Sequence, residues 1–166
     1  MTVIITPLSD ADPYAVEALL DAAFGADRHT RTAYRIRKGT TAIPALSFAA
    51  FDADTLVGTL QCWPVSVGET ALTLVGPVAV APDVQRGGIG RALMTMHIDT
   101  APDAPMVMIG DPEYYGRFFG FTADATGGWD VPGPVERHRL LARTADGLPI
   151  TGFLGPRAFA LTEPKA

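Results

Sequence analysis

The stretch Val75-Gly76-Pro77-Val78-Ala79-Val80-Ala81-Pro82-Asp83-Val84-Gln85-Arg86-Gly87-Gly88-Ile89-Gly90-Arg91-Ala92-Leu93-Met94 decides the fold. An apolar run typical of a buried strand leads through a Pro-Asp turn into a glycine-rich loop, which opens directly into a helix. The first N–H groups of a helix have no intrahelical partner, and the helix dipole adds partial positive charge there. Glycines let the backbone come close to oxygen atoms. The stretch therefore predicts a binding site for a phosphate or pyrophosphate group.

Two common phosphate-binding motifs do not match this loop. A Walker loop requires a lysine directly after its last glycine, and no lysine follows Gly88 or Gly90. A dinucleotide-binding fingerprint requires glycine or alanine where Leu93 stands. The loop taken alone also fits a purely structural role, in which its glycines only allow close packing of a helix on a strand.

Two segments carry a family resemblance. Residues 85–90, Gln-Arg-Gly-Gly-Ile-Gly, fit the pattern Gln/Arg-x-x-Gly-x-Gly/Ala and resemble the acyl-CoA signature of the GNAT superfamily of N-acetyltransferases. Residues 107–121, VMIGDPEYYGRFFGF, resemble the strand, helix and Gly-Phe segment of that superfamily. They look especially like a bacterial branch with Gly-Asp-Pro-x-Tyr-Tyr-x-Arg-Phe-Gly-Phe. With the preceding hairpin, the resemblance covers roughly residues 45–142, and more loosely the N-terminal helices.

The resemblance implies a fold and an activity. The expected fold is α+β, a single GNAT-like domain over residues 1–166 with a mixed, mostly antiparallel sheet flanked by helices. The expected activity is acetyl-CoA-dependent N-acetylation of a primary amine, on a small molecule or a protein, by direct transfer in a ternary complex. The alternative is a non-catalytic acyl-CoA-binding sensor or interaction module, because the phosphate cradle looks the same in both. Exposed strand edges in this architecture also allow a homodimer.

The cofactor-binding residues are carried over from the resemblance. It implies that the main chain of Val78 and Val80 binds the pantetheine arm, and that backbone N–H groups of the loop and helix start hold the pyrophosphate. Arg86 and Arg91 would add charge-assisted contacts, because a guanidinium matches phosphate geometry. The predicted cofactor-binding residues are Val78, Ala79, Val80, Gln85, Arg86, Gly87, Gly88, Ile89, Gly90, Arg91 and Ala92.

The family tyrosine that protonates the leaving CoA thiolate matches Tyr115. Phe118-Phe119 adds one residue to the branch pattern, so that counting back from the Gly-Phe end puts Gly116 at the tyrosine's place. We place the extra residue after the tyrosines, because Asp111-Pro112 fixes the start of the helix. Tyr115 is then the predicted general acid. Tyr114 is its substitute, with aromatic packing as the alternative role.

A general base is harder to identify. Asp111 follows a predicted strand and is a candidate base, but its residue type and position also fit a helix N-cap. A chain of water molecules is the alternative to a dedicated base. Cys62 and His97 are interpreted as structural residues, and neither a Cys-His nor a Ser-His-Asp arrangement is indicated. No spacing of residues indicates a metal site.

The acceptor pocket is expected between segments with weak sequence signals. These are the first two helices, the surroundings of Trp63, and the loop at residues 127–134. A basic run, residues 28–38, is interpreted as a solvated helix face rather than an anion-binding patch.

Composition limits the class of protein. The 166 residues are 48% hydrophobic and 19% charged, which is typical of a folded globular domain. A net charge of −5 argues against binding to nucleic acids or anionic membranes, although it suits a cationic acceptor. No apolar run approaches the ~20 residues of a membrane span. The single Cys62 and the absence of a signal-like start predict a cytoplasmic protein.

The pattern of apolar residues predicts the secondary structure. A helix begins at Pro13 with Asp12 as N-cap and stops at Gly25; others cover residues 30–38, the segment behind the glycine loop, and a short segment from Pro112. The predicted strands are residues 3–7, 46–51, 56–67, 72–81, 106–109, a segment from Phe121 onward, and a last strand at 138–143. The predicted packed face of the helix behind the loop is Ile89, Ala92, Leu93, Met96 and Thr100. Residues 145–166 are not assigned.

Overall fold

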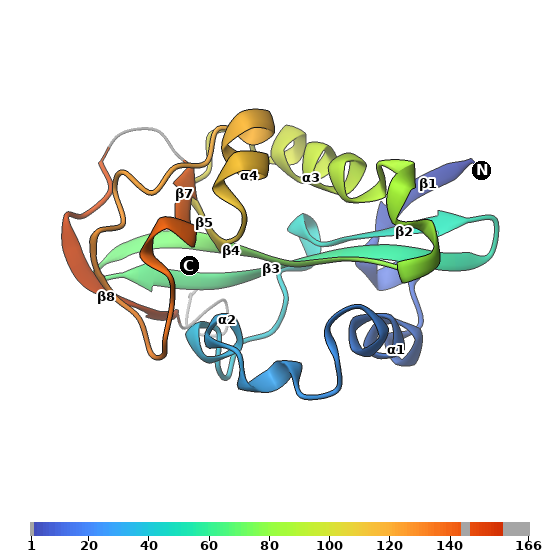
Figure 1. Cartoon of the computed structure of the whole chain (residues 1–166), viewed down its shortest axis with the longest axis horizontal. Helices are drawn as coiled ribbons and strands as arrows, with labels where there is room; N and C mark the ends of the chain where they lie inside the picture. The colour runs from blue at the N-terminus through green and yellow to red at the C-terminus, as the bar shows by residue number, and fades with distance from the viewer. Residues whose placement is uncertain (1, 144–146, 158–166) are drawn as a thin grey trace, which may run out of the picture. The chain divides into compact units, whose positions relative to one another are not determined.

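Two long adjacent strands, β3 (Thr55–Val67) and β4 (Thr70–Val80), form the centre of the sheet in this computed structural model (Figure 1). They are rich in β-branched and aliphatic residues, and most of their residues are buried. The structure describes residues 2–143 and 147–157, without the side chains of residues 85–87. The chain divides into two compact units, and each long strand contributes to both.

Unit 1 comprises Met1–His29, Ala42–Cys62 and Val75–Pro102. Its strand order is β1-β2-β3-β4, where β1 is Val3–Pro7 and β2 is Phe48–Asp52. β1 pairs antiparallel with β2, and β2 pairs antiparallel with β3. The predicted first strand is confirmed at both ends, and the predicted hairpin between β2 and β3 turns at Ala53, with a φ of 53°.

Helix α1 (Pro13–Phe24) covers one face of the strands of unit 1 (Figure 1). Its caps are those predicted, because the Asp12 side chain accepts a hydrogen bond from the N–H of Tyr14 at 3.0 Å and Gly25 ends the helix with a φ of 94°. Its apolar stripe packs against β2 and β4 in a cluster formed by Ala11, Val16, Leu19, Leu20, Ala49 and Ala79.

Helix α3 (Ile89–Thr100) covers the opposite face of the same strands (Figure 1). It comes so close to β3 that a Cβ added at Gly58 would lie 2.7 Å from Cγ2 of Ile89. The predicted packed face is partly wrong. Ile89 and Leu93 are buried as expected, but Ala92, Met96 and Thr100 are exposed, and Met94 and His97 are buried instead.

The burial of His97 explains this error. Its ring is fully buried, and Nδ1 lies 3.5 Å from Sγ of Cys62 on β3. The buried face of α3 therefore continues from Ile89 and Leu93 to His97 at intervals of four residues, although histidine counts as polar on a hydropathy scale. Both residues are structural, as predicted, but no spacing in the sequence indicated that they touch. Burial raises the pKa of the Cys62 thiol well above its usual range, which favours the protonated thiol at neutral pH.

Unit 2 comprises Thr30–Thr41, Trp63–Leu74 and Asp103–Ala166. Its elements beside β3 and β4 are α2 (Thr32–Ile36), β5 (Met106–Ile109), α4 (Pro112–Phe119), β6 (Gly128–Asp130), β7 (Leu140–Arg143) and β8 (Thr151–Pro156). β4 pairs parallel with β5, while β5 pairs antiparallel with β7 and β3 with β8. The predicted α+β fold with a mixed, mostly antiparallel sheet is confirmed, whereas the single domain stays a prediction.

The core of unit 2 surrounds Trp129, which is fully buried on the short strand β6. Its Nε1 donates to the carbonyl of Pro149 at 2.8 Å, and β6 pairs parallel with β8. The other buried members of this core are Ile36, Val65, Val67, Leu72, Leu74, Val107, Leu140, Ala142 and Leu154.

Several predicted boundaries in unit 2 are wrong. After Phe121 there is only one bridge, Thr122 to Ala142, in place of a strand, and β6 lies inside the segment expected to be a loop. The predicted last strand is shortened to β7 by a 3₁₀ turn over Arg137–Arg139, and β8 follows it. The unassigned segment thus contains a strand, while residues 145–146 and 158–166 lie outside the described residues.

The basic run at residues 28–38 is not one solvated helix face. It divides into a 3₁₀ turn (Arg28–Thr30) and the short helix α2, so the predicted helix over 30–38 is too long. Arg28 and Arg37 are buried, whereas the other cations of the run are exposed.

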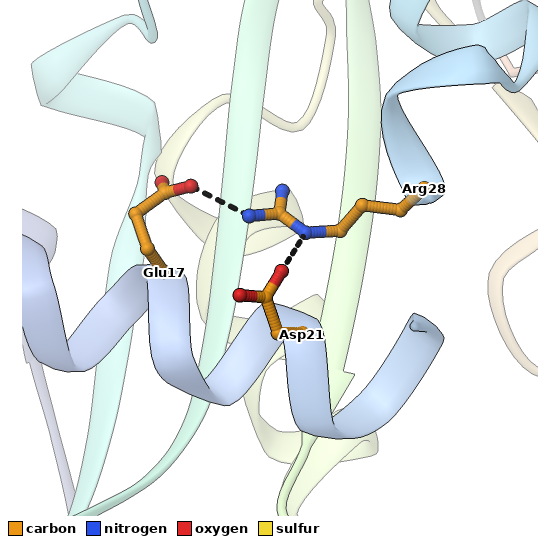
Figure 2. Close-up of polar contacts among 3 residues, drawn as sticks. All are labelled: Glu17, Asp21 and Arg28. Carbon is orange, nitrogen blue, oxygen red and sulfur yellow. Dashed lines mark hydrogen bonds and ion pairs between the residues drawn. The ribbon is translucent and has the colours of Figure 1, made fainter. Parts of the chain in front are cut away.

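The Arg28 side chain, from the segment that follows α1, forms ion pairs with two carboxylates of α1 (Figure 2). Only 2% of its side chain is exposed. Its Nε donates to Oδ1 of Asp21 at 3.0 Å, and its Nη2 donates to Oε1 of Glu17 at 2.6 Å. Both carboxylates are about half exposed, so they keep contact with water while they compensate a buried cation.

Because the cation is buried, loss of one carboxylate has a larger effect than loss of an ordinary surface ion pair. We expect Asp21→Ala to lower the free energy of unfolding by about 1.5–3 kcal/mol, the range for hydrogen bonds to charged groups. Urea denaturation measures this, with Asp99→Asn on the exposed side of α3 as the control variant. Equal stabilities of the two variants would contradict the prediction.

One general feature concerns membranes. Among the helices that the structure describes, none has both the length and the hydropathy to cross a bilayer.

Candidate active site

The predicted phosphate loop is a 3₁₀ turn, Pro82–Gly87, followed by Gly88 and the first turn of α3. Gly88 is the N-cap and has left-handed dihedrals (φ 71°, ψ 19°), which glycine adopts without strain. The first bond inside the helix runs from the N–H of Ala92 to the carbonyl of Gly88 at 3.0 Å. The side chains of residues 85–87, which include the predicted contacts Gln85 and Arg86, lie outside the described residues.

The N-terminus of α3 differs from those of α1 and α4. The latter two are capped by the carboxylates of Asp12 and Asp111, whereas no described side chain makes a capping hydrogen bond at α3. The backbone N–H groups of this first turn therefore offer the positive end of a helix to an external anion.

Strand β4 runs beside this helix start. A Cβ added at Gly90 would lie 3.6 Å from Cγ2 of Val80 and 3.8 Å from Cγ1 of Val78, so both valines border the first turn of α3. Ala79 is fully buried in the α1 cluster on the other face. The structure thus brings the predicted pantetheine strand and the predicted phosphate loop together within unit 1.

The predicted catalytic residues belong to unit 2. Asp111 accepts a hydrogen bond from the N–H of Glu113 at 3.0 Å and so caps α4, while Pro112 occupies the first helical position. The start of α4 is therefore fixed where the sequence placed it. Capping engages one carboxylate oxygen of Asp111, and its catalytic role stays a prediction.

Tyr115 packs against the chain just before α4. A Cβ at Gly110 would lie 2.8 Å from Cδ2 and Cε2 of the Tyr115 ring, so only glycine fits beneath this ring. Burial, together with the neighbouring Tyr114 and Asp111, raises the pKa of Tyr115 to about 12, and the positive charge of Arg139 opposes this shift. Tyr115 is therefore a protonated hydrogen-bond donor at neutral pH.

Helix α4 has no bulge at Phe118-Phe119, where the sequence adds one residue to the branch pattern. The helix runs without interruption to Phe119 and closes at Gly120, which has a φ of 78°. The N–H of Phe121 then bonds the carbonyl of Tyr115 at 3.2 Å. The ring of Tyr114 lies 4.9 Å from that of Tyr115 in an edge-to-face contact, which agrees with aromatic packing.

Sequence reasoning missed Arg139. Its carbonyl accepts a hydrogen bond from the N–H of Gly110 at 3.0 Å, which places β7 beside the start of α4. Arg139 lies 24 residues after Tyr115 in the chain, so no local pattern connects the two residues.

The comparisons with known proteins identify the family. The model of the Acetyltransferase (GNAT) family matches residues 14–121, well over half of the chain. The chain belongs to the GNAT family. A search of curated proteins found no significant match.

Solved structures agree on the fold. A GNAT family N-acetyltransferase (YhbS) from Escherichia coli, in complex with CoA, aligns with a TM-score of 0.70 at 23% identity and covers 93% of this chain and 89% of its own. A GNAT family acetyltransferase from Brucella melitensis, in complex with acetyl-CoA, aligns with a TM-score of 0.65 at 22% identity and covers 95% and 97%. PH1933 from Pyrococcus horikoshii OT3 aligns with a TM-score of 0.57 at 16% identity and covers 87% and 99%.

In this GNAT protein, several segments expected to form the acceptor pocket meet within unit 2. Arg37, which follows α2, lies over the ring of Trp63 at 3.6 Å and over that of Tyr34 at 4.0 Å. The hydroxyl of Thr32 on α2 donates a hydrogen bond to the carbonyl of Pro134. A Cβ at Gly133 would lie 2.6 Å from the Thr32 hydroxyl, so this loop is held tightly against α2.

Metal binding finds no support in the described part of the chain, where no three His, Cys, Asp or Glu side chains gather closely enough to hold an ion.

Because the pKa of buried Tyr115 is raised, the free energy of unfolding should fall as the solution becomes alkaline. The unfolded phenol has a pKa near 10 and the folded one near 12, so its contribution to stability is complete below pH 10 and is lost as pH rises towards 12. The free energy of unfolding of the parent protein should fall between about pH 8 and pH 11 because of this titration. We expect this fall to be smaller by about 1 kcal/mol in Tyr115→Phe. Urea denaturation at both pH values measures it, with exposed Tyr14→Phe as the control, and an unchanged loss would refute it.

Proposed function

We propose that this GNAT protein transfers the acetyl group of acetyl-CoA directly to a primary amine in a ternary complex. The observation that carries the proposal is the N-terminus of α3, which begins at the left-handed Gly88, lacks a capping side chain among the described residues, and borders Val78 and Val80 of β4. A helix end of this kind suits the pyrophosphate of CoA. The CoA complex of the Escherichia coli protein and the acetyl-CoA complex of the Brucella melitensis protein support this choice of ligand.

We assign the cofactor contacts as the sequence predicts them. The main chain of Val78 and Val80 receives the pantetheine arm. Of the backbone N–H groups predicted for the pyrophosphate, Arg86 to Ala92, that of Ala92 is bonded within the helix, so those from Arg86 to Arg91 receive it. Arg91 adds a charge-assisted contact from the first turn of α3. Acetyl-CoA is thus an acyl donor held mainly by backbone, which explains why small residues dominate the loop.

The proton balance of the reaction defines the role of Tyr115. The amine attacks the thioester carbonyl, the C–S bond breaks, the nitrogen loses one proton and the CoA thiolate gains one. Burial raises the pKa of Tyr115 to about 12, so the phenol stays protonated at neutral pH and has a proton to offer the leaving thiolate. Tyr115 therefore stabilises the leaving thiolate as a hydrogen-bond donor, and the proton released by the amine restores the balance through water.

Binding and turnover separate the enzyme from a non-catalytic acyl-CoA sensor. The first experiment is isothermal titration of acetyl-CoA, CoA and ATP into the purified protein. Micromolar binding of acetyl-CoA without ATP binding supports the site, and thiol release with a panel of primary amines then supports catalysis. Binding without thiol release for any amine favours the sensor, and no binding of either CoA species overturns the proposal.

The backbone conformation of Gly88 can be tested with a matched glycine. Gly88→Ala forces a left-handed alanine at the phosphate site, with a strain of about 1–2 kcal/mol that the site avoids by shifting. We expect about a 5- to 30-fold loss of acetyl-CoA affinity. Gly68→Ala is the control, because Gly68 also has a positive φ (59°) with open space around its Cβ position, but lies in the turn between β3 and β4. Equal affinities in the two variants would disprove the assignment.

The hydrogen bond from Tyr115 is tested by removing its hydroxyl. Tyr115→Phe should lower kcat by about 100–1000-fold, the range for removing one hydrogen-bond donor to a developing anion, and leave the acetyl-CoA affinity unchanged. Tyr114→Phe, which alters a neighbouring packed ring, should leave kcat within about threefold of the parent value. If Tyr114→Phe has the larger effect, the roles of the two tyrosines are exchanged.

A further inference from the structure

Gly110 and Arg139 stand opposite each other at one end of the β5–β7 ladder, within unit 2. The register pairs Ile109 with Leu140, and the N–H of Gly110 donates to the carbonyl of Arg139 at 3.0 Å, which extends the pairing by one residue. Side chains of directly opposite residues on antiparallel strands project from the same face, with Cβ atoms about 4.5–5.5 Å apart. The side chain of Arg139 therefore leaves the ladder on the face where a side chain at Gly110 would stand.

The ring of Tyr115 occupies the place of that missing side chain. A Cβ at Gly110 would lie 2.8 Å from both Cδ2 and Cε2 of the ring, which is closer than real Cβ atoms come. The glycine thus admits the ring to a position directly across the ladder from Arg139. A cation beside β7 and the phenol of α4 share one face of unit 2, although 24 residues separate them in the sequence.

A second arginine, at the far end of β7, shows that α4 lies along this face. Arg143 comes four residues after Arg139, so its side chain projects from the same face of the strand. Its Nε donates to the carbonyl of Phe119, the last residue of α4, at 2.8 Å. Arg143 therefore stands at the end of the helix, and Arg139 stands at its beginning.

The helix dipole explains the first of these positions but not the second. A cation is favourable at the C-terminal end of a helix and unfavourable at the N-terminal end. The N-terminus of α4 is already capped by Asp111. Arg139 has an ion pair with Glu136, but Nε and Oε1 are 3.9 Å apart, and an exposed pair at this distance contributes little to stability. The fold therefore gives little reason for a cation at this position.

Arg139 acts on the phenol against the other groups around it. Burial, Tyr114 and Asp111 all raise the pKa of Tyr115, whereas the guanidinium of Arg139 lowers it. The aromatic rings of Phe119 and Phe121 also pack near the Tyr115 ring and carry no charge. Arg139 is thus a cation placed where it favours negative charge on the phenol oxygen.

We propose that Arg139 is a positioning residue of the transfer reaction, which acts through the hydroxyl of Tyr115. This inference rests on the proposed acetyltransferase function and adds a residue from outside its motifs. As the C–S bond breaks, the phenol donates a hydrogen bond to the sulfur and negative charge builds up on its oxygen. The guanidinium stabilises this charge without gaining or losing a proton, because arginine stays protonated in proteins.

Ionisation of the phenol tests this placement in the protein alone. Tyr115→difluorotyrosine makes the phenol more acidic and sets fluorine atoms beside its oxygen, so fluorine NMR follows its titration at pH values where the protein is folded. The midpoint pH should be higher with Arg139→Gln than with arginine, because the phenolate then lacks its neighbouring cation. Arg139→Lys keeps the charge and should hold the midpoint between these two values.

Arg143→Gln is the matched control, since it removes a cation from the same face of β7 at the other end of α4. It should move the midpoint less than Arg139→Gln does. An unmoved midpoint in Arg139→Gln, or a larger shift in Arg143→Gln, would overturn the inference.

Isothermal titration of acetyl-CoA into the parent protein keeps this inference apart from the proposed function. The fluorine titration requires neither acetyl-CoA nor an amine. Intact acetyl-CoA binding with an unmoved midpoint refutes the role of Arg139 alone. Absence of acetyl-CoA binding refutes the proposed function, and with it any catalytic meaning of a shifted midpoint.

Where an amine is acetylated, a double-mutant cycle adds a readout that a purely structural role would not move. Arg139→Gln should lower kcat by about two- to fivefold, the equivalent of one partly exposed charge interaction, and leave the acetyl-CoA affinity unchanged. In the Tyr115→Phe background the same substitution should leave kcat unchanged, because the hydroxyl through which Arg139 acts is absent. Equal fold-losses of kcat in both backgrounds would contradict action through Tyr115.

Discussion

The close approach of α3 to β3 at Gly58 is the constraint on which unit 1 depends. Any side chain at this position would meet Ile89, and the helix would have to move away from the strand. The first turn of α3 lies beside Val78 and Val80 of β4, where the proposed cofactor contacts are placed. Gly58, outside the glycine loop, is therefore part of the packing that supports the proposed site.

The sequence predicted the features that depend on local chemistry. Asp12-Pro13 and Asp111-Pro112 start helices because a carboxylate caps the first N–H groups and proline suits the first turn, and these rules hold wherever the segment lies. Glycines with positive φ, such as Gly25 and Gly120, likewise mark helix ends from local dihedrals alone.

The features that escaped prediction depend on distant partners. His97 belongs to the buried face of α3 only because Cys62 lies opposite, and β6 is a strand only because β8 pairs with it. The candidate tyrosines of unit 2 and the candidate phosphate loop of unit 1 were predicted from motifs. Arg139 was not, because its influence on Tyr115 comes from a contact between distant segments rather than from spacing.

The two tryptophans of unit 2 give the protein an internal optical reference. Trp129 is fully buried and its indole N–H is bonded to a backbone carbonyl, so its emission stays blue-shifted and insensitive to solutes. Trp63 is only partly buried and its ring lies under the guanidinium of Arg37 at 3.6 Å. We expect movement of Arg37 to change the electric field at the Trp63 ring and thus the fluorescence of Trp63. The ratio of the two signals reports on the segment after α2 without an added label.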